Sequence, residues 1–216
     1  MKNFFASIFG KSQTDKVQVV GPKKILFSVP TLSDDIASLE PLNEKPSSKD
    51  FGFHEDEWCQ IEFFPKSQLT TIQQILKEYK QFEQTHRVHQ GWDAVYVRKI
   101  QRGPVLSSIQ PIENLEKLLG AKAGSAPFLF TYGAISGKVK NGFTIPLGGN
   151  ITIYGYVDGD NIPVLGANVG KSPDDSRLTD AFLKLNASDG LLLIDWRAQL
   201  LIIGASSDSQ VEVWHP

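Results

Sequence analysis

Cysteine is almost absent from this chain, because Cys59 is the single cysteine among 216 residues. A lone cysteine excludes an intramolecular disulfide and any cluster of thiolates that could hold zinc or an iron–sulfur group. Chains without disulfides are typical of reducing compartments. The sequence therefore predicts a cytoplasmic protein without a bound metal or other cofactor.

The chain also lacks a strong excess of one charge. It carries 22 basic and 24 acidic residues, a formal net charge of -2. Residues 1–127 have 16 basic and 15 acidic residues, and residues 128–216 have 6 and 9. A nucleic-acid-binding domain is typically basic on at least one face. We therefore expect no nucleic acid among the partners.

No long apolar run is present, whereas a helix that spans a bilayer needs about 18 or more apolar residues in succession. The nearest feature lies close to the N-terminus, where Phe4, Phe5, Ile8 and Phe9 share one face of a short predicted helix. No cleavage pattern of a signal peptide follows. This face can dock on the protein's own core, bind a partner, or make a weak contact with a membrane surface through residues 3–9. We favour docking on the core.

A complete phosphate-binding loop is missing as well. Residues 164–175 read VLGANVGKSPDD, but Gly166 and Gly170 enclose three residues, whereas the phosphate loop needs four. Asp174 and Asp175 place negative charge where a phosphate would bind. We therefore expect no nucleotide here, and interpret the segment as the start of a helix with Ser172 as its N-cap.

Amphipathic helices and alternating strands are what the chain does contain. A long helix near residues 67–85 is predicted by an apolar stripe that repeats every three or four residues: Leu69, Ile72, Ile75, Leu76, Tyr79 and Phe82. Shorter helices are predicted over residues 32–39 and 113–119. Residues 57–64 alternate between two faces, which indicates a half-buried strand. Cys59 falls on the more apolar face, as a buried and inert thiol would.

These elements predict an α+β fold, with largely antiparallel sheet packed with a few amphipathic helices. A stretch of small residues, 120–127, is the best candidate for a boundary. It would separate an N-terminal α+β region, residues 1–120, from a C-terminal α+β region, residues 128–216. The two regions are either similar sub-domains or parts of one continuous domain.

The densest polar cluster is FHEDEWC at residues 53–59. His54, Glu55 and Glu57 are the candidates for a catalytic base or for metal-assisted hydrolysis. The zinc-protease pattern H-E-x-x-H is not met, because Trp58 stands where the second histidine is required. We favour the simpler interpretation, in which the cluster is a solvated strand end.

Aromatic residues beside charges or turns are the candidates for partner contact. They are Trp58, Trp92, Trp196 and Trp214, together with Phe4 and Phe5. Tryptophan is enriched at the centres of protein interfaces, although each of the four also fits a hydrophobic core.

The leading hypothesis is a non-catalytic, soluble protein-binding module, for example one that inhibits or neutralises a toxic partner. One alternative is a metal-assisted hydrolase that uses the acidic and histidine cluster at residues 54–57. Another is a peripheral membrane or assembly protein that uses the N-terminal helix.

Overall fold

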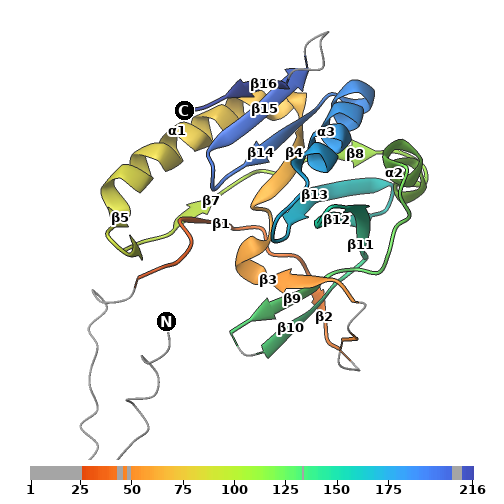
Figure 1. Ribbon diagram of the computed structural model, residues 1–216, viewed down its shortest axis with the longest axis horizontal. Coiled ribbons are helices and arrows are strands. Elements are labelled where there is room, and N and C mark those ends of the chain that lie inside the picture. The colour runs from red at the N-terminus through yellow and green to blue at the C-terminus, as the bar shows by residue number, and fades with distance from the viewer. Residues whose placement is uncertain (1–25, 43–45, 48–49, 133, 206–210) are drawn as a thin grey trace, which may run out of the picture.

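The computed structural model describes residues 26–42, 46–47, 50–132, 134–205 and 211–216, and Figure 1 shows their arrangement. The described chain has the expected α+β fold, in which helices pack against largely antiparallel sheet. The predicted N-terminal helix, with Phe4 and Phe5, lies outside the described residues. None of the helices in this part of the chain combines the length and the apolar character needed to cross a membrane.

The main sheet of the described chain has eight strands in the order β11-β12-β13-β4-β14-β15-β16, with β8 paired to β13. Every pairing in it is antiparallel. The strands are β4 (Ile61–Pro65), β8 (Leu106–Ser107), β11 (Gly142–Gly148), β12 (Ile151–Asp158), β13 (Asn161–Val169), β14 (Leu191–Asp195), β15 (Leu200–Ala205) and β16 (Val211–Trp214). Strand β4, from the first predicted region, therefore lies between two strands of the second.

Helices cover both faces of the main sheet. On one face, Phe64 of β4 packs with Ile72, Leu76 and Tyr79 of α1 (Leu69–His86). On the other face, Phe63 packs with residues of α2 (Pro111–Leu119) and α3 (Asp175–Asp189). Because β4 is central, both of its faces are buried, and the half-buried strand expected here is instead fully enclosed.

A smaller four-stranded sheet lies beneath the main one in Figure 1, in the order β2-β10-β9-β3. Its strands are β2 (Leu39–Glu40), β3 (Gly52–His54), β9 (Phe128–Thr131) and β10 (Ala134–Val139). Two further pairs join β1 (Thr31–Ser33) to β7 (Tyr96–Arg98), in parallel, and β5 (Arg87–Val88) to β6 (Gly91–Trp92). A third apolar cluster, which includes Phe53, Trp58 and Tyr154, connects the small sheet to the main one.

The long helix predicted near residues 67–85 is confirmed as α1, but three local predictions are wrong. Residues 32–39 form no helix, because Leu32 and Ser33 pair with β7 and Leu39 pairs with β10. A helix of two turns is too weak on its own to compete with such pairing. The strand expected from residue 57 begins only at Ile61, after the 3-10 turn η2 (Glu55–Glu57).

The third correction concerns the start of α3. Ser172 has a φ of 51° and does not cap the helix. Asp174 is the N-cap, and its side chain accepts a hydrogen bond from the Ser176 amide at 3.2 Å. The rejected phosphate loop lies just before it, and Gly166 is part of the extended strand β13, where it pairs with Glu62. An extended backbone cannot wrap a phosphate.

Candidate functional site

The acidic turn η2 lines several hollows of the described surface. It follows β3 and precedes β4, and it presents Glu55, Asp56 and Glu57 in a single 3-10 turn. His54 is its N-cap, and the His54 Nδ1 accepts a hydrogen bond from the Asp56 amide at 3.2 Å. Negative side chains are favourable at such an N-terminus, where backbone N–H groups point outward.

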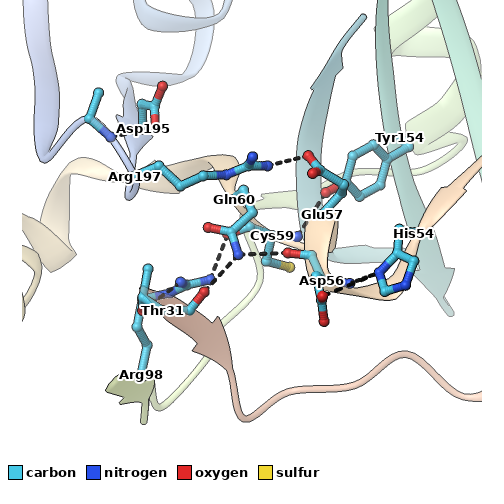
Figure 2. A network of polar contacts seen from close by, with 11 residues as sticks. Thr31, His54, Asp56, Glu57, Cys59, Gln60, Arg98, Tyr154, Asp195 and Arg197 are labelled. Atoms are coloured by element: carbon cyan, nitrogen blue, oxygen red, sulfur yellow. Dashed lines mark hydrogen bonds and ion pairs between the residues drawn. The ribbon is translucent and has the colours of Figure 1, made fainter. Parts of the chain in front are cut away.

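The buried side-chain amide of Gln60 connects the turn to β1. Gln60 is 2% exposed, and its Nε2 donates to the Asp56 carbonyl at 2.7 Å and to the Thr31 carbonyl at 2.8 Å. Figure 2 shows this side chain between the two segments. Two carbonyl partners can only be satisfied by the NH₂ group, so the orientation of the amide is fixed. The turn and the start of β1 are therefore tied to one side chain.

A buried charge cluster fixes the loop next to the turn. Glu62 is fully buried, and its carboxylate lies 2.7 Å from Arg102 Nη1 and accepts a hydrogen bond from Trp196 Nε1 at 2.7 Å. Arg102 Nε lies 2.6 Å from the Asp35 carboxylate. The Asp35 carbonyl also accepts from Trp58 Nε1 at 3.1 Å. Loop residues 34–38 are thus held at Asp35 from two sides.

Burial and charge act in opposite directions on the arginines of this region. Burial lowers the pKa of Arg102, but the charges of Glu62 and Asp35 outweigh burial and raise that pKa above its ordinary value. For Arg98, burial prevails and lowers the pKa. Arg98 donates to Thr31 Oγ1 at 2.9 Å and to the Cys59 carbonyl at 2.8 Å, and its guanidinium lies 4.9 Å from the Trp196 ring centroid. Both arginines therefore bind buried partners, and neither presents its charge at the surface of the turn.

Cys59 lies directly after the turn and is fully buried. Burial raises the pKa of its thiol well above the ordinary value, which disfavours the reactive thiolate. Its amide donates to Tyr154 Oη at 2.8 Å, and its backbone has a φ of 55°. The left-handed residue thus lies between the turn and β4, and its hydrogen bond joins this segment to Tyr154 of β12.

An apolar pocket of about 170 Å³ opens beside η2, and we call it the apolar pocket. It is lined by Leu32, Ser33, Ile36, Glu55, Asp56, Trp58 and Leu129. Ile36 is 74% exposed, whereas Trp58 is 4% exposed and packs against Tyr154 with ring centroids 5.0 Å apart. The pocket thus has a firm aromatic wall, an exposed apolar side chain and two carboxylates. Among the described residues, no basic side chain lines it.

A second, more open hollow of about 470 Å³ lies on another side of the turn. We call it the open hollow, and its lining is Ser28, Val29, His54, Asp56, Glu57, Thr131 and Tyr132. Asp56 belongs to both cavities. Tyr132 is 93% exposed and meets the His54 ring edge-on, with ring centroids 5.7 Å apart. We use the name η2 face for the turn together with the apolar pocket and the open hollow.

The three catalytic candidates lie side by side, but they face different partners. His54 Nδ1 is 3.3 Å from Asp56 Oδ2, Glu55 accepts a hydrogen bond from Ser136 Oγ at 3.5 Å, and Glu57 forms an ion pair with Arg197, as Figure 2 shows for Glu57. Among the described residues, no three or more His, Cys, Asp and Glu side chains are grouped so that they could hold a metal ion.

The four tryptophans differ in exposure. Trp196 is fully buried, and Trp58 is 4% exposed and lines the apolar pocket. Trp92 and Trp214 are half-buried. The exposed apolar residues beside the turn, Ile36 and Tyr132, were missed. Ile36 matched the spacing of the helix expected over residues 32–39, and this wrong assignment concealed its exposure.

Comparisons with known proteins give no family to which the chain could be assigned, because no family model, curated protein or solved structure matches it.

Proposed function

We propose that this protein is a non-catalytic protein-binding module whose contact surface is the η2 face. The observation that carries the proposal is the apolar pocket with its acidic rim, beside an isoleucine that is 74% exposed. A volume of about 170 Å³ suits a single apolar side chain of a partner. An exposed apolar anchor surrounded by polar groups is the usual arrangement at the centre of a protein interface.

The charges of the face favour a basic partner. Glu55 and Asp56 line the apolar pocket, and Asp56 and Glu57 line the open hollow. Carboxylates around an apolar anchor accelerate the approach of a basic surface and orient it. The partner segment that fits best therefore has one apolar side chain with lysine or arginine beside it. Covering such a segment is one way to inhibit or neutralise a partner.

The buried contacts that hold the η2 face in place also support a role in binding. Gln60 ties the turn to β1, and Arg102 ties loop residues 34–38 to Glu62. A surface that is already ordered loses less conformational entropy when a partner binds.

The hydrolase alternative has less support. The three candidate side chains contact different partners: His54 Nδ1 lies 3.3 Å from Asp56 Oδ2, Glu55 accepts a hydrogen bond from Ser136, and Glu57 pairs with Arg197.

Two exposed isoleucines provide a matched test. Ile36 is 74% exposed in the apolar pocket, and Ile109 is 81% exposed just before α2. A photoreactive side chain at position 36, used in the native source, captures the partner for identification by mass spectrometry. With the purified partner, we expect Ile36→Glu to raise the dissociation constant by about 10-fold or more, about 1.4 kcal/mol. Ile109→Glu is expected to have no effect. Equal affinities of the two variants would refute the proposal.

A further inference from the structure

The charges of this chain are unevenly distributed at its start. Residues 1–25 carry five lysines and one aspartate. Residues 26–60, which include loop residues 34–38 and the turn η2, carry eight acidic residues and two lysines. Residues 61–216 carry fifteen residues of each sign. The basic excess of the chain is thus confined to the segment that precedes its acidic one.

We infer that residues 1–25 are themselves an occupant of the η2 face, with one aromatic side chain of residues 4–9 in the apolar pocket. The inference relies on the proposed function only for the location of the face. The segment has both features that the face selects. Phe4, Phe5, Ile8 and Phe9 are apolar, and Lys2 and Lys11 flank them.

The size of the pocket agrees with an aromatic ring. An apolar cavity of about 150 Å³ is known to hold a benzene molecule, and the apolar pocket has about 170 Å³. Lysines on either side of the ring would lie within reach of Glu55 and Asp56 at the rim. Attraction of this kind acts over about 10 Å at moderate ionic strength.

Residues 10–25, which connect the apolar residues 4–9 to the described chain, join it near the η2 face and are long enough to reach back to that face. The described chain begins at Leu26, and Ser28 and Val29 already line the open hollow beside Asp56. Leu32 and Ser33 line the apolar pocket. Between Phe9 and Leu26 lie 16 residues, and 16 residues can reach at most roughly 55 Å when fully extended. The segment therefore starts next to the face and can fold back onto it.

Attachment makes even weak docking effective. A short flexible tether gives an effective concentration on the order of 1 mM. If the free segment binds with a dissociation constant of about 0.1 mM, the attached segment covers the face for about nine-tenths of the time, and an external partner binds about 10-fold more weakly. The attached segment would then compete with a basic, apolar partner for the same pocket.

Intramolecular cross-linking in the purified full-length protein tests this contact without any partner. A photoreactive side chain at position 36 is compared with the same side chain at position 109, and cross-linked peptides are identified after proteolysis. We expect cross-links from position 36 to residues 1–11, and we expect them to decrease at roughly 1 M ionic strength, where the Debye length is about 3 Å. Absence of these cross-links, or equal yields from both positions, would overturn the inference.

A second measurement uses a chain that lacks residues 1–16 and a synthetic peptide of those residues. We expect the peptide to shift the NMR signals of residues 32–38 and 55–58, whereas a peptide with serine at positions 4, 5, 8 and 9 shifts none. If the native peptide also shifts none, the inference fails. The proposed function is judged separately, by whether Ile36→Glu weakens partner binding in the truncated chain.

Discussion

At the level of single side chains, the buried pair of Glu62 and Arg102 connects β4 of the main sheet to loop residues 34–38. Glu62 is fully buried, and its oxygens face Arg102 Nη1 and Trp196 Nε1, each at 2.7 Å. A buried pair of this kind costs desolvation energy to form, but it is expensive to break because one charge is left without its partner. Arg102 also pairs with the Asp35 carboxylate, and the Asp35 carbonyl accepts a hydrogen bond from Trp58, which lines the apolar pocket.

We therefore expect Glu62→Gln to lower the free energy of unfolding by about 3 kcal/mol, because the buried guanidinium of Arg102 loses its nearest countercharge. Chemical denaturation measures the change. The control is Glu57→Gln, at the exposed pair with Arg197, which is expected to cost less than about 1 kcal/mol. Similar losses in the two variants would contradict the role given to burial.

Tyr79 gives a prediction on pH. Burial, followed by the charge of Glu83, raises the pKa of Tyr79 from 10.0 to about 12. Because the folded pKa is the higher one, the stabilising contribution is complete below pH 10 and is lost as the pH rises towards 12. In urea denaturation, we expect the stability of Tyr79→Phe to fall less steeply over this range than that of the unaltered protein. Tyr132→Phe, at a ring that is 93% exposed, is expected to follow the unaltered protein.

Among the elements, the long helix α1 and the short helix α2, expected over residues 113–119, were predictable, but the short helix expected over residues 32–39 is absent. The stripe of α1 identified that helix because it repeats from Leu69 to Phe82, along most of a helix of 18 residues. Residues 32–39 also have helical spacing, yet they pair with β7 and β10 instead. Such pairing is set by strands that lie far away in the sequence. No local pattern can therefore reveal it.

The site was predictable in the same partial way. The polar cluster at residues 54–57 was identified from its composition, and it forms the turn at the centre of the η2 face. The apolar pocket was not predictable, since Leu129 reaches it from β9 and Ile36 from a distant loop. Nor could the sequence indicate that Arg102 would be the partner of Asp35.

The start of α3 allows a direct comparison of two caps. Asp174 accepts hydrogen bonds from the Ser176 hydroxyl at 2.6 Å and from the Ser176 amide at 3.2 Å, and both lower the pKa of its carboxyl. Its folded pKa is the lower one, so the contribution to stability is present above the unfolded value and is lost as the pH falls. We expect Asp174→Ala to lower the melting temperature at pH 7, whereas Ser172→Ala does not. A larger effect of Ser172→Ala would restore the cap expected from the sequence.

The whole molecule is joined through β4. This strand pairs with β13 at Gly166 on one side and with all five residues of β14 on the other. Its neighbours Phe63 and Phe64 enter the cores on opposite faces of the sheet. The stretch of small residues at 120–127 is itself bonded to β11, because the Gly124 amide donates to the Thr144 carbonyl at 2.7 Å.

Separating the chain at that stretch tests how far the two regions depend on each other. Without β4, a fragment of residues 128–216 has nothing to pair between β13 and β14, and both strands become exposed apolar edges. We therefore expect this fragment alone to give a poorly dispersed amide NMR spectrum, and the same for residues 1–120. The intact chain is expected to unfold in a single cooperative transition, because each core contains residues from both regions. A dispersed spectrum from residues 128–216 alone would show that the second region has an independent core and that β4 is only attached to it.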